Sequence, residues 1–247
     1  MSARINASGG EAPSAEPYVP KGTVSLAVLA KAVQGCRGCA IYKCGTRAVM
    51  GEGAAGGIML VGEQPGDIEE QRGHPFVGPA GQMLDKALAQ AGIDRSRTFV
   101  TNAVKHFKFG EQRGKRRIHS KPSAREADAC RPWLEREIVI IRPRAVVALG
   151  ATAAQSLLGR EFRITRDGGK IVRDSPWAPI LLATGHPSAI LRKPTSEERR
   201  RAFEALVRDL QLVASALRGP APGRGAQSRA ARPAVRSARS AQMGGRP

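Results

Sequence analysis

Residues 58–67, IMLVGEQPGD, decide the fold of this chain. An uninterrupted apolar run ends at Gly62, and a turn rich in Gly and Pro follows it. A short apolar run that is closed by a turn is typical of a strand buried on both faces of a parallel sheet.

The same arrangement recurs on both sides of this stretch. Further strands are predicted at 99–104, 145–150 and 180–184, and helices at 23–35, 80–92, 124–141, 151–159 and 196–217. Thr23 and Ser196 are the candidate N-caps of the first and last helix, and 160–177 is expected to be a hairpin or loop. Alternating strands and helices predict an α/β protein, a three-layer α/β/α arrangement around a central, mainly parallel four-stranded sheet.

The composition predicts one folded domain between two tails. With 247 residues and 41% hydrophobic residues, the chain can bury a core. Polar residues dominate 1–22, and Ala, Arg, Gly, Pro and Ser dominate 218–247, so we expect a disordered leader, a domain at 23–217 and a disordered basic tail. No apolar run approaches the roughly 20 residues of a membrane span, and the leader lacks the apolar core of a secretory signal. We therefore expect a cytoplasmic protein without a membrane partner.

Charge and cysteine usage point to nucleic acid and to a metal. The formal net charge is +19, and seven Arg but no acidic residue lie between Arg218 and Pro247. Such an excess attracts polyanions, nucleic acid first. Three of the four cysteines, Cys36, Cys39 and Cys44, fall within nine residues, and Cys130 is distant. In a reducing compartment this cluster favours metal or redox chemistry over disulfides.

Polar segments follow the predicted strands: GEQPGD, NAVKH, GAT and GHPS. Ligands bind beyond the carboxyl ends of parallel strands, so these loops are expected to form one site. The stretch 102–119, NAVKHFKFGEQRGKRRIH, has the composition of a basic surface loop when taken alone. Next to the other loops, it is interpreted as part of the site.

Several separated motifs resemble those of one enzyme superfamily. GEQPGDIEEQRGHPFVGPAG (62–81) resembles the first motif of the uracil-DNA glycosylases, particularly their iron–sulfur members, and GHPS (185–188) resembles the second. TNAVKH (101–106) is similar to the Asn segment between them. GEQPGD together with KRRIH (115–119) is closest to the UdgX branch, whose members become covalently linked to DNA. The resemblance extends from about residue 30 to 215.

The resemblance implies a pocket that reads a flipped uracil. Asn102 would bond to the O4 and N3–H edge, where cytosine presents the reverse pattern, and Phe76 would stack on the base. His186 would bond to uracil O2 and stabilise the negative charge that develops on the leaving base. Ser188 would hold a DNA phosphate.

The first motif supplies three further candidates. Glu63 and Asp67 are assigned to stabilising the sugar cation or positioning water, and which acid activates water stays open. Gln64 is assigned to uracil. Either Glu63 or Gln64 is expected to lie near uracil C5 and to exclude thymine.

The second His of the central stretch carries the most distinctive expectation. Bond cleavage leaves an electrophilic C1′, and a neutral imidazole within about 3–3.5 Å competes with water for it. The resemblance implies that His119 is this nucleophile, which would leave the protein attached to its product after one turnover. Lys115, Arg116 and Arg117 would hold the flanking phosphates.

The resemblance also implies a 4Fe-4S cluster held by Cys36, Cys39, His106 and Cys130. His ligation of an iron–sulfur centre has a precedent in Rieske proteins. Cys44 is the alternative fourth ligand, and zinc is the alternative metal because a Cys₃His set suits it equally. A ligand thirteen residues before His119 would anchor the loop and reduce its ordering entropy.

We therefore expect a monomeric bacterial DNA repair enzyme of the cytoplasm and nucleoid. Its partner would be uracil-containing DNA, with single strands accepted. Two alternatives remain: an ordinary multiple-turnover family 4 glycosylase and a non-catalytic nucleic-acid-binding module. Release of free uracil in large molar excess would favour the multiple-turnover enzyme.

Overall fold

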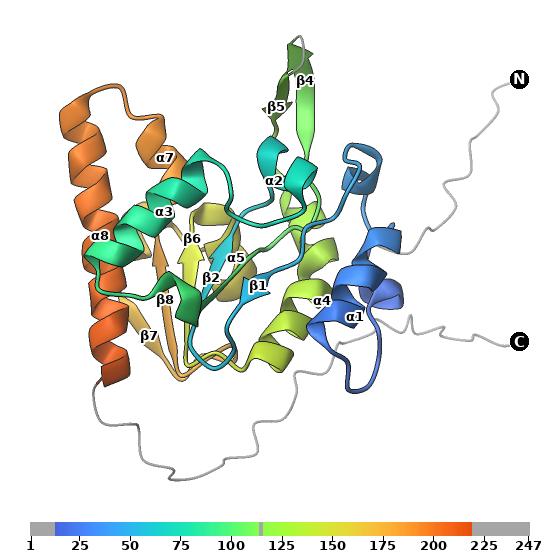
Figure 1. Cartoon of the computed structure of the whole chain (residues 1–247), viewed down its shortest axis with the longest axis horizontal. Coiled ribbons are helices and arrows are strands. Elements are labelled where there is room, and N and C mark those ends of the chain that lie inside the picture. The colour runs from blue at the N-terminus through green and yellow to red at the C-terminus, as the bar shows by residue number, and fades with distance from the viewer. Residues whose placement is uncertain (1–12, 114–115, 219–247) are drawn as a thin grey trace, which may run out of the picture.

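The computed structural model describes residues 13–113 and 116–218 (Figure 1). A six-stranded sheet has the order β1-β3-β2-β6-β8-β7. Its four central strands, β3, β2, β6 and β8, are parallel and are the four that the sequence predicts. The bounds are β1 (Glu52–Gly53), β2 (Ile58–Gly62), β3 (Thr98–Asn102), β6 (Ala145–Leu149), β7 (Ile171–Arg173) and β8 (Ile180–Thr184). The predicted fold class is confirmed.

The sheet is wider than predicted because each edge carries a short antiparallel strand. β1 pairs with β3, and β7 pairs with β8. β7 lies within 160–177, where a hairpin or loop was expected, together with α6 (Ile164–Asp167). These edge strands were missed because they are only two and three residues long, and β7 is not fully buried. Short, partly exposed strands lack the apolar run that marks a central strand.

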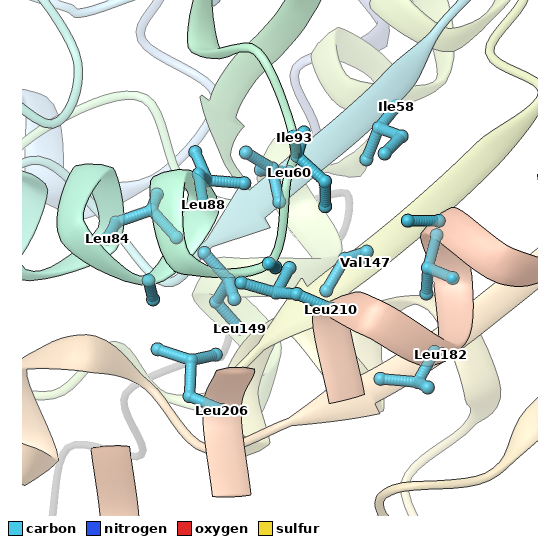
Figure 2. Packing of buried hydrophobic residues seen from close by; sticks show 14 of the residues in the cluster. Ile58, Leu60, Leu84, Leu88, Ile93, Val147, Leu149, Leu182, Leu206 and Leu210 are labelled. Carbon is cyan, nitrogen blue, oxygen red and sulfur yellow. The ribbon is translucent and has the colours of Figure 1, made fainter. Parts of the chain in front are cut away.

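Side chains of the central strands alternate between two apolar layers. Ile58 and Leu60 pack with α3 (Pro79–Gln90), α7 (Pro187–Leu191) and α8 (Ser196–Arg218). Figure 2 shows Leu84 and Leu88 of α3, and Leu206 and Leu210 of α8, gathered around this face. Met59 and Val61 pack on the other face, with α4 (Ala124–Ile141) and α5 (Ala151–Leu158). Because both faces are covered, every residue of these strands is buried, which explains the apolar runs of β2, β6 and β8.

Side-chain caps set the starts of α1, α4 and α8. Ser123 and Glu126 form a reciprocal capping box at α4, as the predicted start after Pro122-Ser123 requires. Two predicted caps were misplaced. Ser25 Oγ, not Thr23, caps α1 (Leu26–Ala32) by accepting from the Val28 amide at 3.3 Å. At α8 the reciprocal pair is Thr195 and Glu198, one residue before the predicted Ser196.

The basic segment after β3 is a β-hairpin and not the loop that was expected. β4 (Phe109–Arg113) pairs antiparallel with β5 (Arg116–His119), with Phe109 opposite His119. The hairpin extends beyond the carboxyl end of the sheet, beside α2 (Asp67–Arg72) (Figure 1). Its charged composition masked the strand pattern. Lys115 lies outside the described residues.

The N-terminal boundary also differs from the expectation. Ala15 is 1% exposed, and its amide donates to the Ala129 carbonyl of α4 at 2.8 Å. The packed domain therefore includes part of the predicted leader 1–22, and residues 1–12 and 219–247 lie outside the described range. Short helices complete the fold at Glu16–Tyr18, Val33–Gly35, Ala40–Lys43 and Arg95–Arg97. No helix in residues 13–113 and 116–218 has the length and apolarity to cross a bilayer.

Candidate active site at the carboxyl ends of the strands

Two strand-end loops and the hairpin meet around one carboxylate. Glu63 follows β2, and it accepts a short hydrogen bond from the Thr152 hydroxyl, which follows β6. The other oxygen, Oε1, lies 3.2 Å from His119 Nε2 at the end of the hairpin. The structure thus brings Glu63 and His119 together, as expected for loops at one end of a parallel sheet. Thr152 was missed because the GAT loop shows no motif beyond a helix start.

Glu63 is held in its charged form. Burial alone would raise the pKa of this carboxyl, but hydrogen bonds from His119 and Thr152 outweigh burial and lower the pKa below its usual value. His119 is half exposed at its side chain, so the imidazole faces both Glu63 and solvent. A charged acceptor beside an accessible imidazole suits a nucleophile that must lose a proton when it reacts.

Phe76 and Asn102 meet above Gly62, the last residue of β2. A Cβ at Gly62 would collide with Asn102 Oδ1 and would lie 2.7 Å from Phe76 Cζ. Only glycine therefore leaves room for both side chains here. Phe76 has φ +57°. Its carbonyl oxygen packs against Gly81, where a Cβ would lie only 1.7 Å from that oxygen. A non-glycine residue in this region costs on the order of 1–3 kcal/mol, and such strain concentrates at functional sites.

His186 has one defined tautomer. The Ser188 amide donates to His186 Nδ1 at 3.1 Å, and the Ser188 hydroxyl lies 2.8 Å from the same nitrogen. Because an amide N–H can only donate, Nδ1 carries no proton and Nε2 carries it. Burial lowers the pKa of His186 to about 4, so the ring is neutral. The Phe76 and His186 rings lie 6.2 Å apart.

The predicted phosphate contact of Ser188 remains an expectation. Its hydroxyl accepts from Arg192 Nη1 at 3.1 Å and therefore donates to His186. In this structure the side chain orients the imidazole. Sequence reasoning did not single out Arg192, which lies outside the four-residue motif.

Gln64 has partners that its predicted uracil contact did not anticipate. Its Nε2 donates to the carbonyls of Lys108 and Ser120, at 3.0 and 3.2 Å, and its Oε1 accepts from the Lys108 amide at 3.2 Å. The side chain thus joins both ends of the hairpin at its base. These partners lie 44 and 56 residues away in sequence, so no local pattern indicated them.

Arg117 and Asp67 were assigned to phosphate and to the sugar, and here they bind each other. Arg117 Nε lies 2.6 Å from Asp67 Oδ1, and Arg117 Nη1 lies 2.5 Å from Glu70 Oε2. The guanidinium also lies over the rings of Phe107 and Phe109, at 5.3 and 5.1 Å. Arg117 therefore points back to α2 and ties the hairpin to it. The side chain of Arg116, like the whole of Lys115, lies outside what the structure describes.

A separate pocket collects the predicted metal ligands, away from the contacts around Glu63. Cys36, Cys39, His106 and Cys130 line it together, and Cys44 is not among the described residues that do so. Two thiols accept N–H groups at 3.3 Å: Cys36 from the Trp133 indole and Cys130 from the Lys105 amide. Burial lowers the pKa of His106, which keeps its imidazole neutral and able to bind a metal. The donor set fits an iron–sulfur centre.

Within residues 13–113 and 116–218, no three His, Cys, Asp or Glu side chains converge closely enough to bind one ion.

Comparison with known families places this geometry in a defined class. Residues 50–211 match the uracil DNA glycosylase superfamily, and the chain belongs to that superfamily of DNA repair hydrolases. Within it, the chain is similar to type-4 uracil-DNA glycosylases. It is 35% identical to that of Pyrobaculum aerophilum over 69% of this chain and 87% of the relative. For Archaeoglobus fulgidus the figures are 34%, 70% and 87%, and for Thermotoga maritima 34%, 72% and 90%.

Proposed function

We propose that this chain removes uracil from DNA and then becomes covalently attached, through His119, to the abasic sugar that remains. The observation that carries the proposal is the 3.2 Å contact between His119 Nε2 and Glu63 Oε1. Glu63 directly follows Gly62, the glycine on which Phe76 and Asn102 meet, and the His186 ring lies 6.2 Å from that of Phe76. An accessible imidazole with a charged acceptor beside it is suited to capture C1′.

Recognition uses the three side chains of that pocket. Phe76 stacks on the flipped base, and the Asn102 amide bonds to the O4 and N3–H edge. The Nε2–H of neutral His186 donates to uracil O2 and stabilises the charge left when the glycosidic bond breaks. A site that pairs its buried polar groups with one base rejects other bases by roughly 10⁴–10⁵.

Capture of the sugar exchanges the bond from C1′ to uracil for a bond from C1′ to His119. The electron pair of the C1′–N1 bond leaves with uracil, and a nitrogen lone pair of His119 forms a new bond to C1′. The imidazole becomes positively charged, and Glu63 stabilises this charge and accepts the proton of the second ring nitrogen. Once that proton is lost, His119 could leave C1′ only as an imidazolate anion, which is a poor leaving group, so the product stays attached.

Cys36, Cys39, His106 and Cys130 would hold a 4Fe-4S cluster in this proposal. The cluster would supply a structural anchor for the segment that leads from Asn102 to the hairpin. DNA would approach from the hairpin side, and single-stranded uracil DNA is the proposed substrate because it requires no unpairing.

Multiple-turnover excision is the second candidate function. The similarity to type-4 uracil-DNA glycosylases favours it. Here water would capture C1′, and Glu63 or Asp67 would position it. The two candidates share their base-reading pocket and differ in the role of His119.

One experiment separates them. The protein is incubated with single-stranded DNA that contains one uracil, and the mixture is boiled in SDS and run on a gel. We expect one shifted band per protein, and its loss in His119→Ser. His74→Ser is the matched control, because His74 is also exposed but pairs with Glu52 away from the pocket. A shifted band in His119→Ser, or uracil released in large molar excess over the wild-type protein, would overturn the proposal.

A further inference from the structure

A buried ion pair lies behind the proposed base-reading residues and contacts one of them, Asn102, at its backbone carbonyl. Lys105 and Glu137 are both 0% exposed, and Nζ lies 2.7 Å from Oε2. Nζ also donates to Thr101 Oγ1 at 2.8 Å and to the Asn102 carbonyl at 2.7 Å. All three ammonium protons therefore have acceptors.

Glu137 closes the same network from α4. Its Oε2 accepts from the Thr101 hydroxyl at 2.8 Å, and its Oε1 accepts from the Gly51 amide at 2.7 Å. The pair thus joins the end of β3, helix α4 and the segment before β1 at one point. Both charged groups thus have hydrogen-bond partners, which a buried charge requires.

Lys105 also faces the cysteine pocket. Its backbone amide donates to Cys130 Sγ at 3.3 Å, and its neighbour His106 lines that pocket. Cys130 and Glu137 lie two turns apart on α4, so they share one face of the helix. This face of α4 therefore contacts Lys105 twice. The Cys130 thiol accepts from its backbone amide, and the Glu137 carboxylate pairs with its side chain.

The pair is a poor source of stability. Taking two charges out of water costs several kcal/mol per ion, and apolar replacement of a buried pair is often neutral or stabilising. Its contacts bear instead on orientation. Lys105 Nζ holds the Thr101 hydroxyl and the Asn102 carbonyl, which lie on either side of the Cα atom that carries the Asn102 side chain above Gly62.

We propose that the Lys105–Glu137 pair is a positioning unit that fixes Asn102, and thereby uracil recognition, from the side of the cysteine pocket. This inference rests on the proposed base-reading role of Asn102. Lys105 touches neither base nor sugar in it, so it acts through Asn102 alone. A displacement of about 1 Å at a reacting group can cost roughly 100-fold in rate.

A double-mutant cycle tests the inference. Lys105→Met with Glu137→Gln removes both charges while keeping an acceptor for the Gly51 amide, and single-turnover uracil excision is measured with and without Asn102→Ala. We expect the charge-free variant to be slowed roughly 100-fold, and to cause no further slowing once Asn102 is Ala. A merely structural pair would slow both backgrounds by the same factor, and that result would overturn the inference. So would unchanged excision in the charge-free variant.

Two measurements keep the outcomes distinct. Thermal unfolding and visible absorbance of the purified holoprotein are expected to stay at wild-type values in the charge-free variant. If that variant fails to fold, Thr101→Val removes one hydroxyl of the network and is tested in the same cycle, with the same two results deciding. Full activity of Asn102→Ala alone would instead overturn the base-reading role of Asn102, which is a failure of the proposed function itself.

Discussion

At the scale of single residues, the chemistry of the pocket depends on the position of one proton. His186 accepts the Ser188 amide at Nδ1, so its only proton is on Nε2, where a donor to uracil O2 is needed. The motif GHPS predicts a His at this place. It does not predict the tautomer, which depends on the direction of an amide two residues away.

The pKa of His186 gives a pH dependence of stability. The unfolded imidazole binds a proton below about pH 6.5, whereas burial lowers the pKa of the folded one to about 4. Between these values the unfolded state binds more protons, so the free energy of unfolding falls as the pH falls. We expect His186 to account for a loss of about 2 kcal/mol between pH 7 and 5.

Urea unfolding of the wild-type protein and of His186→Gln at both pH values measures this loss. The Gln variant keeps a polar group of similar reach but does not titrate. Its stability should therefore fall less over the same interval. An identical fall in both proteins would show that His186 does not titrate as its burial requires.

At the scale of elements, the hairpin β4–β5 determines where His119 lies. Gln64 joins both of its ends at the base, and Arg117 ties β5 to α2 through Asp67 and Glu70. The first motif thus supplies both the carboxylate that faces His119 and the residues that hold the hairpin. Attachment at two places limits the entropy that the hairpin must lose when DNA binds.

Removing the clamp at the base should loosen His119 without altering the base-reading pocket. In Gln64→Ala the carbonyls of Lys108 and Ser120 lose their shared donor, so His119 is less often beside Glu63. We expect a lower adduct yield and a higher ratio of free uracil to adduct, because water then captures more of the sugar. Timed SDS gels together with uracil quantification measure both.

A control variant removes another side-chain amide of the domain. Gln155→Ala removes a bond to the Phe162 carbonyl, remote from the hairpin, and should leave the ratio unchanged. An unchanged ratio in Gln64→Ala would mean that Arg117 alone holds the hairpin.

The strands were predictable and the hairpin was not, for a physical reason. Burial on two faces selects an unbroken apolar run. Such runs predicted the bounds of β2, β6 and β8 to within one residue. The hairpin is stabilised by Arg117 over two rings and by Gln64, contacts that join distant residues. Likewise, the motifs indicated Glu63, Asn102 and His186, but Thr152 and Lys105 acquire roles only when the loops meet.

At the scale of the whole molecule, the cysteine pocket gathers segments that are far apart in the chain. Ala15, Cys36, His106 and Cys130 all line it, and His106 begins the segment that leads to the hairpin. A group bound there would fix the start of that segment, as Gln64 fixes the base of the hairpin. The short segment from Asn102 to His106 therefore connects the proposed base-reading residues to the cysteine pocket.

His106→Ala tests this connection because it removes one proposed ligand and leaves the base-reading residues in place. Anaerobically purified wild-type protein is expected to absorb at about 400 nm, as iron–sulfur proteins do and zinc proteins do not. The variant should lose much of this band and form the adduct slowly or not at all. It should still bind DNA weakly, because the net charge of +19 is unchanged. Fluorescence anisotropy measures that binding.

Cys44→Ser is the control, since Cys44 does not line the pocket. If Cys44→Ser loses the band while His106→Ala keeps both band and adduct, Cys44 is the fourth ligand, and the hairpin is positioned without help from the cluster.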